Sequence, residues 1–71
     1  RLSEEIYTAR MNFKPIVGHV YHFYKDKNNI AILSLIAPED WNGRCPYQFE
    51  ATVKLLADHT WQVLSENNDT N

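Results

Sequence analysis

One cysteine and three histidines are the side chains of this sequence best suited to nucleophilic or metal chemistry. A nucleophilic Cys45 would need an activating histidine, and His59, oriented by Asp58, is the candidate. Asp58 and His59 are adjacent in an expected turn, so we expect their side chains to diverge and Asp58 to bond to backbone amides of that turn. Cys45 is expected to pack as a small hydrophobic residue. An enzyme that uses Cys45 and His59 is therefore the third hypothesis, and no catalytic residue is assigned.

The spacing of the histidines does not favour a metal site. His19 and His22 lie three residues apart in an expected strand, where such side chains point to opposite faces. No cysteine or histidine pair has zinc-finger spacing. Glu39 and Asp40 follow Pro38 at the start of an expected helical turn, and their charges there complement the helix dipole. We expect no metal and no cofactor.

Charge and aromatic content define a nucleic-acid hypothesis. The formal net charge is −2, and the seven lysines and arginines are scattered along the chain. Tyr21, Phe23, Tyr24 and Tyr47 could form a stacking platform, but without a positive field the attraction for phosphate is weak. Binding of single-stranded RNA is therefore the alternative hypothesis, and nucleic acid is not the expected partner.

Length and composition limit the protein to one small domain. The chain has 71 residues, of which 44% are hydrophobic, and it contains one cysteine. One cysteine excludes an internal disulfide framework. No apolar run approaches the roughly 18 residues of a membrane span, and no signal-peptide pattern is present. We expect a cytoplasmic protein that does not associate with membranes.

The two ends of the chain differ from its middle. Leu2, Ile6 and Ala9 have the spacing of a helical stripe, so residues 1–11 are predicted to be the end of a truncated helical segment. Residues 65–71 are polar throughout and are predicted to be a disordered tail. Residues 12–64 are predicted to form a small antiparallel β domain.

Four segments have the pattern of strands. Residues 20–24 are apolar or amphipathic on both faces, and residues 30–36 are almost continuously apolar, which predicts burial on both sides. Residues 37–43 are predicted to form a helical turn before the third strand. Residues 60–64 form the last strand. The clearest alternation lies in residues 47–55, where every second residue is apolar: Tyr47, Phe49, Ala51, Val53 and Leu55.

The predicted fold class is α+β, with a short N-terminal helix followed by a four-stranded antiparallel β-meander. Short links between the strands favour a meander, because a parallel pair needs a crossover of about a dozen residues. A sheet curled into a small, partly open barrel is the competing architecture. Trp41, on the helical turn, is expected to plug an open end of either one.

Several short stretches between roughly residues 12 and 64 carry a resemblance to a known family. They include Lys14-Pro15, Gly18, Tyr21-His22-Phe23-Tyr24, Ser34, Pro38, Trp41, Cys45-Pro46 and Leu55-Leu56-Ala57-Asp58-His59-Thr60-Trp61. In these residues the sequence resembles an uncharacterised domain-of-unknown-function family, which occurs in bacteria and animals as short conserved-hypothetical proteins. The resemblance implies the same architecture, with a longer helical segment before it, and implies no activity, cofactor or catalytic residue. Asn42, between Trp41 and Gly43, departs from the family's Trp-Gly pair.

The leading functional hypothesis is a small, non-enzymatic protein-interaction module. If only one face of the first strand meets the core, aromatic side chains stay exposed, and such a patch marks a contact site. The partner would be a protein segment or the protein's own upstream helix. A homo-oligomer formed through an exposed sheet or helix face is a further expectation. The candidate binding residues are Tyr21, Tyr24, Trp41 and Trp61.

Overall fold

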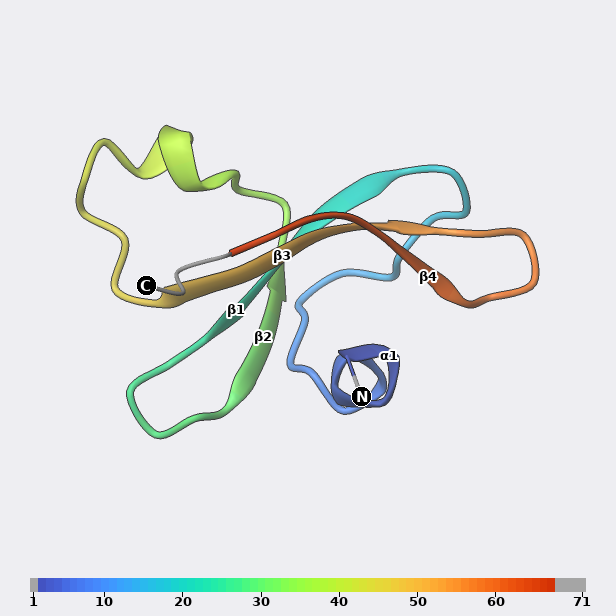
Figure 1. The fold of residues 1–71 in the computed structure, drawn as a ribbon, viewed down its shortest axis with the longest axis horizontal. Coiled ribbons are helices and arrows are strands. Elements are labelled where there is room, and N and C mark those ends of the chain that lie inside the picture. Colours follow the sequence, from blue (N-terminus) through green and yellow to red (C-terminus); the bar gives the residue numbers. More distant parts are fainter. Residues whose placement is uncertain (1, 68–71) are drawn as a thin grey trace.

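The computed structural model describes residues 2–67 and contains one sheet with little helix (Figure 1). A short helix, α1, precedes the first strand, and a single 3-10 turn, η1, lies between the second and third strands. In Figure 1, α1 lies below β3 and β4 and to the right of the lower part of β1 and β2, and η1 lies above β3 at the upper left. The elements are α1 (Leu2–Tyr7), β1 (Val20–Lys25), β2 (Ala31–Ser34), η1 (Pro38–Trp41), β3 (Gln48–Leu55) and β4 (Trp61–Glu66).

The four strands form an open antiparallel sheet in the order β2-β1-β3-β4. The predicted antiparallel four-stranded sheet is confirmed, but the meander order is wrong, because β3 pairs with β1 rather than with β2. The connection of residues 35–47 is long enough to carry the chain past β1 and β2 before β3 begins. The sheet is not closed into a barrel. β1 is thus a central strand, which agrees with its apolar character on both faces.

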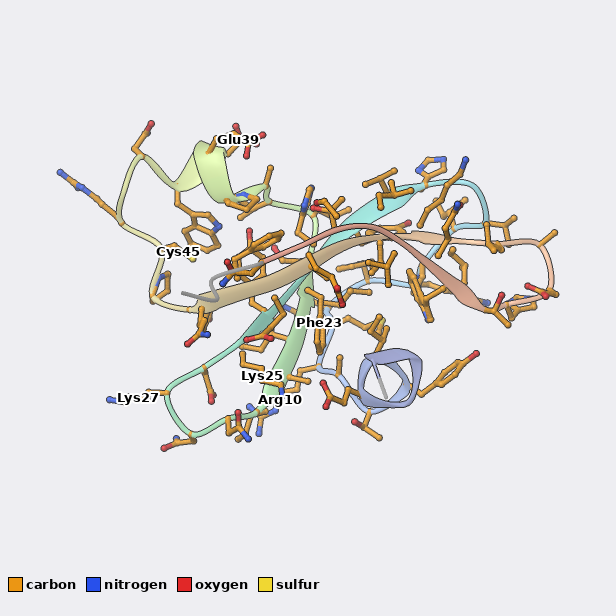
Figure 2. The ribbon with its side chains drawn as sticks, in the orientation of Figure 1. Arg10, Phe23, Lys25, Lys27, Glu39 and Cys45 are labelled. Atoms are coloured by element: carbon orange, nitrogen blue, oxygen red, sulfur yellow. The ribbon has the colours of Figure 1, made fainter. Side chains whose placement is uncertain are left out.

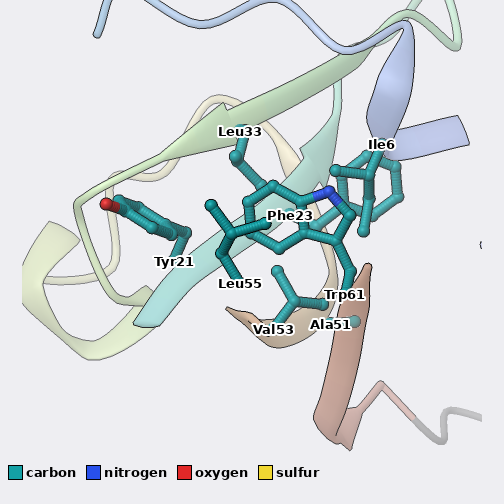
Figure 3. Close-up of a cluster of buried hydrophobic side chains, with 8 residues drawn as sticks. All are labelled: Ile6, Tyr21, Phe23, Leu33, Ala51, Val53, Leu55 and Trp61. Atoms are coloured by element: carbon teal, nitrogen blue, oxygen red, sulfur yellow. The ribbon is translucent and has the colours of Figure 1, made fainter. Parts of the chain in front are cut away.

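One face of the sheet carries the main hydrophobic core (Figure 3). Ile6 of α1 is fully buried against this face, so the short helix covers part of the core. Phe13 stacks on Tyr21 with ring centroids 5.1 Å apart, so the segment before β1 adds to the cover. The core residues are Ile6, Tyr21, Phe23, Leu33, Ala51, Val53, Leu55 and Trp61.

The opposite face carries a second, purely aromatic cluster around Tyr24. A register shift lets Phe23 pair with Ala51 and Tyr24 pair with Phe49, so Glu50 is an extra residue in β3. Such a bulge moves the residues that follow to the other face. The ring of Phe49 lies 5.7 Å from that of Tyr24. The apolar residues of 47–55 therefore lie on both faces of the sheet. Ala51 packs in the main core, and Phe49 packs in the aromatic cluster on the opposite face.

β2 differs from its prediction. It is an edge strand of four residues, and only Leu33 is buried. Leu35 and Ile36 follow its end and are 64% and 42% exposed, so the predicted burial of residues 30–36 on both sides is wrong. The cause is the sheet order, because β2 has a strand neighbour on one side only.

Both ends of the chain also differ from their predictions. α1 ends at Tyr7 instead of continuing to residue 11, because Arg10 forms a parallel bridge with Ile32 at the edge of β2. β4 extends to Glu66, and the backbone N–H of Asn67 donates to Glu50 O at 2.9 Å. The predicted disordered tail is therefore wrong for residues 65–67, which continue the sheet. Its remainder, residues 68–71, lies outside the described residues.

Candidate functional site

The four candidate aromatic residues do not form one exposed surface. Tyr21, Tyr24 and Trp61 are buried, with 2%, 0% and 8% of their surfaces exposed, and Trp41 is half-buried. Tyr21 and Trp61 meet edge to face in the main core, with centroids 6.0 Å apart. Tyr24 and Trp41 meet on the opposite face at 6.2 Å. The expected exposure is wrong for Tyr21 and Tyr24, because both faces of the central strand β1 are covered, and for Trp61, which packs in the main core. Trp41 keeps part of its surface exposed.

The Tyr24 hydroxyl fixes the segment that covers the aromatic cluster. It donates to Ile36 O at 2.6 Å and accepts from Trp41 Nε1 at 3.1 Å. Burial raises the pKa of Tyr24 above its ordinary value, so the hydroxyl keeps its proton. This hydroxyl connects β1 to both ends of the Ile36–Trp41 stretch and holds Trp41 over the sheet.

A groove of about 540 Å³ lies along the outer edge of β2. The segment Arg10–Phe13 forms one wall, and the side chains of Trp41 and Tyr47 form part of the other. Residues 32–36 complete the lining, and the exposed side chains of Leu35 and Ile36 give the groove an apolar surface. Figure 2 shows Arg10 beside the β1–β2 hairpin, well separated from Glu39 on η1.

Arg10 uses part of the outer edge of β2. Its backbone N–H donates to Ala31 O at 2.9 Å, and its carbonyl accepts from Leu33 N at 2.9 Å. The backbone N–H of Leu33 therefore points outward, away from β1. In a strand the N–H and the carbonyl of one residue lie on the same side, so the Leu33 carbonyl also points outward. The next peptide N–H on the same side is that of Leu35, because the preceding Ser34 carbonyl points toward β1. Within residues 2–67, neither Leu33 O nor Leu35 N has a hydrogen-bond partner.

The groove was not predicted from the sequence. Leu35 and Ile36 belong to an apolar run that continues without interruption from the strand, and such a run predicts burial. One available signal is the position of these two residues just before Ala37-Pro38, since a strand rarely continues into a proline. The other wall depends on Arg10–Phe13, which no local pattern places beside β2.

The structure separates the residues of the enzyme hypothesis. Cys45 precedes β3 and His59 follows it, and an eight-residue strand spans about 26 Å. The Cys45 sulfur accepts from Tyr47 N at 3.4 Å and donates to Tyr47 O at 3.3 Å. The Asp58 carboxylate accepts from the backbone N–H and the hydroxyl of Thr60, which lowers the pKa of Asp58. Asp58 thus bonds to its own turn, as expected.

His22 lies in a row of polar side chains that crosses the sheet. Its Nδ1 is 3.1 Å from Thr52 Oγ1, and the strand register places Ser34 on one side and Ser65 beyond Thr52 on the other. Burial lowers the pKa of His22, while the carboxylates on η1 oppose this shift. The row thus holds a neutral imidazole at neutral pH.

Metal sites and membrane spans give no further candidate. Among residues 2–67, no group of three or more His, Cys, Asp or Glu side chains is placed to hold a metal ion. In the same part of the chain, none of the helices has the length and apolar character needed to span a bilayer.

A second hollow of about 230 Å³ lies between α1 and the β3–β4 turn, where the Tyr7 hydroxyl donates to His59 O at 2.6 Å.

Comparison with known proteins identifies the family but not a function. No solved structure matches the chain. A family described as a protein of unknown function, DUF2452, matches residues 1–71. The sequence resemblance to an uncharacterised family is thereby confirmed. The chain belongs to the DUF2452 family.

Proposed function

We propose that this domain is a cytoplasmic, non-enzymatic protein-interaction module that binds an extended peptide in the groove along β2. The observation that carries the proposal is the pair of outward backbone groups, Leu33 O and Leu35 N, on the floor of an apolar groove. Peptides commonly bind by adding a strand to such an open edge, where backbone hydrogen bonds give affinity and pockets for alternate side chains give specificity.

Arg10 supplies the geometric template for the bound peptide. Its N–H and carbonyl bond to Ala31 and Leu33 as one residue of an added parallel strand does. The chain then leaves the edge at Met11 and becomes the groove wall. A peptide residue that bonds to Leu33 O and Leu35 N would repeat the same contact two residues further along β2.

The side chains of the groove indicate the chemistry of the partner. Leu35 and Ile36 are exposed, and Met11, Phe13 and Trp41 are half-buried in the lining. Alternate apolar side chains of an extended peptide would cover this surface. The Arg10 guanidinium favours an acidic residue at that end of the peptide. The proposed partner is therefore an extended segment with alternate apolar residues and a flanking acid.

The RNA alternative receives less support from the packing. Stacking on bases requires exposed rings, and Tyr21, Phe23 and Tyr24 are buried. Tyr47 is half-buried against Tyr24, with ring centroids 6.1 Å apart. A mobility shift of the domain with mixed-sequence single-stranded RNA at low salt would favour this alternative over peptide binding.

The test uses peptides selected on the domain from a random display library. We expect the selected peptides to be acidic and apolar, and to slow hydrogen exchange of the Leu35 amide on binding. Leu35→Lys should weaken their binding at least about tenfold, since it places a charge in the apolar groove. The control is Val17→Lys, which places the same charge at another exposed apolar residue, outside the groove. Equal binding to both variants, or protection of β4 amides in place of Leu35, would refute the proposal.

A further inference from the structure

β4 forms the second edge of the sheet, and its outward backbone groups can be assigned from the hydrogen bonds of its neighbours. Leu55 N donates to His19 O at 3.2 Å and Leu55 O accepts from Gly18 N at 2.7 Å, so Leu55 faces β1. Its partner Trp61 therefore makes no backbone hydrogen bond to β3 and points its N–H and carbonyl outward. By the alternation of a strand, Val63 does the same.

The regular part of this edge, residues 60–63, lacks the charged, proline and covering features that prevent edge-to-edge pairing, and the bulge at Leu64 limits the available edge to this part. Natural edge strands carry lysine, proline or inward-pointing charges, or are covered by another segment. The stretch of residues 60–65 contains no charged residue and no proline. Val63 and Leu64 are 40% and 48% exposed. Among the described residues, no segment bonds to this side of β4.

We propose that β4 pairs antiparallel with β4 of a second copy of the chain across a two-fold axis at Gln62. In this register Trp61 of one copy lies opposite Val63 of the other, and the two copies exchange backbone hydrogen bonds at both such pairs. Gln62 lies opposite itself, with the side-chain amides close enough to bond to each other. The two sheets become one continuous sheet.

The structure selects this register over its neighbours. A register shift between Thr52 and Val53 leaves Leu64 as an extra residue in β4 and turns Ser65 inward. On the other side, His59 has φ +66° and belongs to the turn. An axis at Trp61 would place Val63 opposite His59 of the turn. An axis at Val63 would place Trp61 opposite Ser65, whose backbone groups point inward. Only the axis at Gln62 pairs both Trp61 and Val63.

The pairing of the two β4 strands covers the exposed side chain of Val63 and brings no two like charges opposite each other. Val63 packs beside Trp61 of the second copy, which extends the main core across the axis. The nearest charge on β4 is Glu66, beyond the bulge. The contact is short, so we expect a weak dimer with a dissociation constant of about 0.1 mM.

The first test is a disulfide across the axis, in a Cys45→Ser background that removes the native thiol. Gln62→Cys places two thiols at a non-hydrogen-bonded pair, where Cα atoms are about 4.5 Å apart, within disulfide range. In a glutathione redox buffer we expect this variant to form covalent dimer at least about tenfold faster than Ser65→Cys, which lies on the same strand off the axis. Equal rates would contradict the proposed register.

The second test uses charge at the same position. Gln62→Glu and Gln62→Lys should each lower dimer affinity by about tenfold or more at neutral pH, and an equimolar mixture should restore it. Sedimentation equilibrium measures the association, and Gln48→Glu and Gln48→Lys are matched exposed controls away from β4. A wild-type protein that stays monomeric to about 1 mM, or one that forms open-ended oligomers, would overturn the proposal. Leu35→Lys should leave the dimer affinity unchanged, because Leu35 lies at the other edge of the sheet. A failure of the peptide proposal can therefore be distinguished from a failure of the dimer proposal.

Discussion

The two edges of the sheet differ in what covers their outward backbone groups. At the β2 edge, Arg10 occupies Ala31 O and Leu33 N, and the next groups lie in a groove with walls on both sides. At the β4 edge, the outward groups of Trp61 and Val63 face away from the sheet with no wall from the described residues. The β2 edge suits a thin, extended guest, while the β4 edge suits a flat partner such as its own copy.

Connection length explains the difference between the edges. The groove at the β2 edge is lined by residues 10–13 of the connection before β1 and by residues 35, 36, 41 and 47 of the connection between β2 and β3, so both long connections supply a wall. β3 and β4 are joined by a tight turn, in which His59 N donates to Leu56 O at 2.8 Å. A short turn cannot fold back over its own strand. Long connections therefore decide which edge becomes a site.

The largest expected effect tests how firmly each edge strand is held by packing. Leu33 of β2 is 2% exposed, whereas Val63 of β4 is 40% exposed. Leu33→Ala should lower the free energy of unfolding by about 2–4 kcal/mol, while Val63→Ala should lower it by less than about 1 kcal/mol. Urea unfolding followed by tryptophan fluorescence measures both. The comparison fails if the two losses are equal.

The groove wall should depend on the Tyr24 hydroxyl. Tyr24→Phe leaves Trp41 Nε1 and Ile36 O without their partner, so we expect a loss of about 1–3 kcal/mol in the free energy of unfolding. Tyr7→Phe removes an exposed hydroxyl bond at the other end of the sheet and should cost less than about 1 kcal/mol. Thermal unfolding by near-UV circular dichroism compares the two variants. A larger loss for Tyr7→Phe would contradict the assignment.

The smallest effect concerns His22, which lies in the polar row between the two edges. Its pKa in the folded protein is below its ordinary value of 6.5, so the unfolded chain binds the proton more readily. This contribution to stability is present above pH 6.5 and is lost as the pH falls through the lowered pKa. His22→Gln should therefore lose less stability than the wild type between pH 7 and pH 5. Parallel pH profiles for the two proteins would show that His22 is not responsible.

The local sequence pattern was sufficient to predict the strands but not to predict the groove along β2. The apolar character of Tyr21 and Phe23 and the alternation through Val53 predicted strands that the structure contains. The bulge at Glu50 was not predictable, because it depends on how β3 pairs with β1. The exposure of Leu35 was not predictable either, because an apolar run has the same composition in a central strand and at an edge.

The amino-acid sequence by itself determined four β segments, a helical turn after Pro38, a polar turn at Asp58 and the absence of an internal disulfide. These properties depend on neighbours along the chain, whose periodicity and turn chemistry act locally. Only the tertiary structure decided that β1 lies between β2 and β3, that Tyr24 faces away from Tyr21's core, and that one edge is walled while the other is open. These features arise from pairing between distant segments, for which burial of the whole apolar surface, rather than any local preference, selects the arrangement.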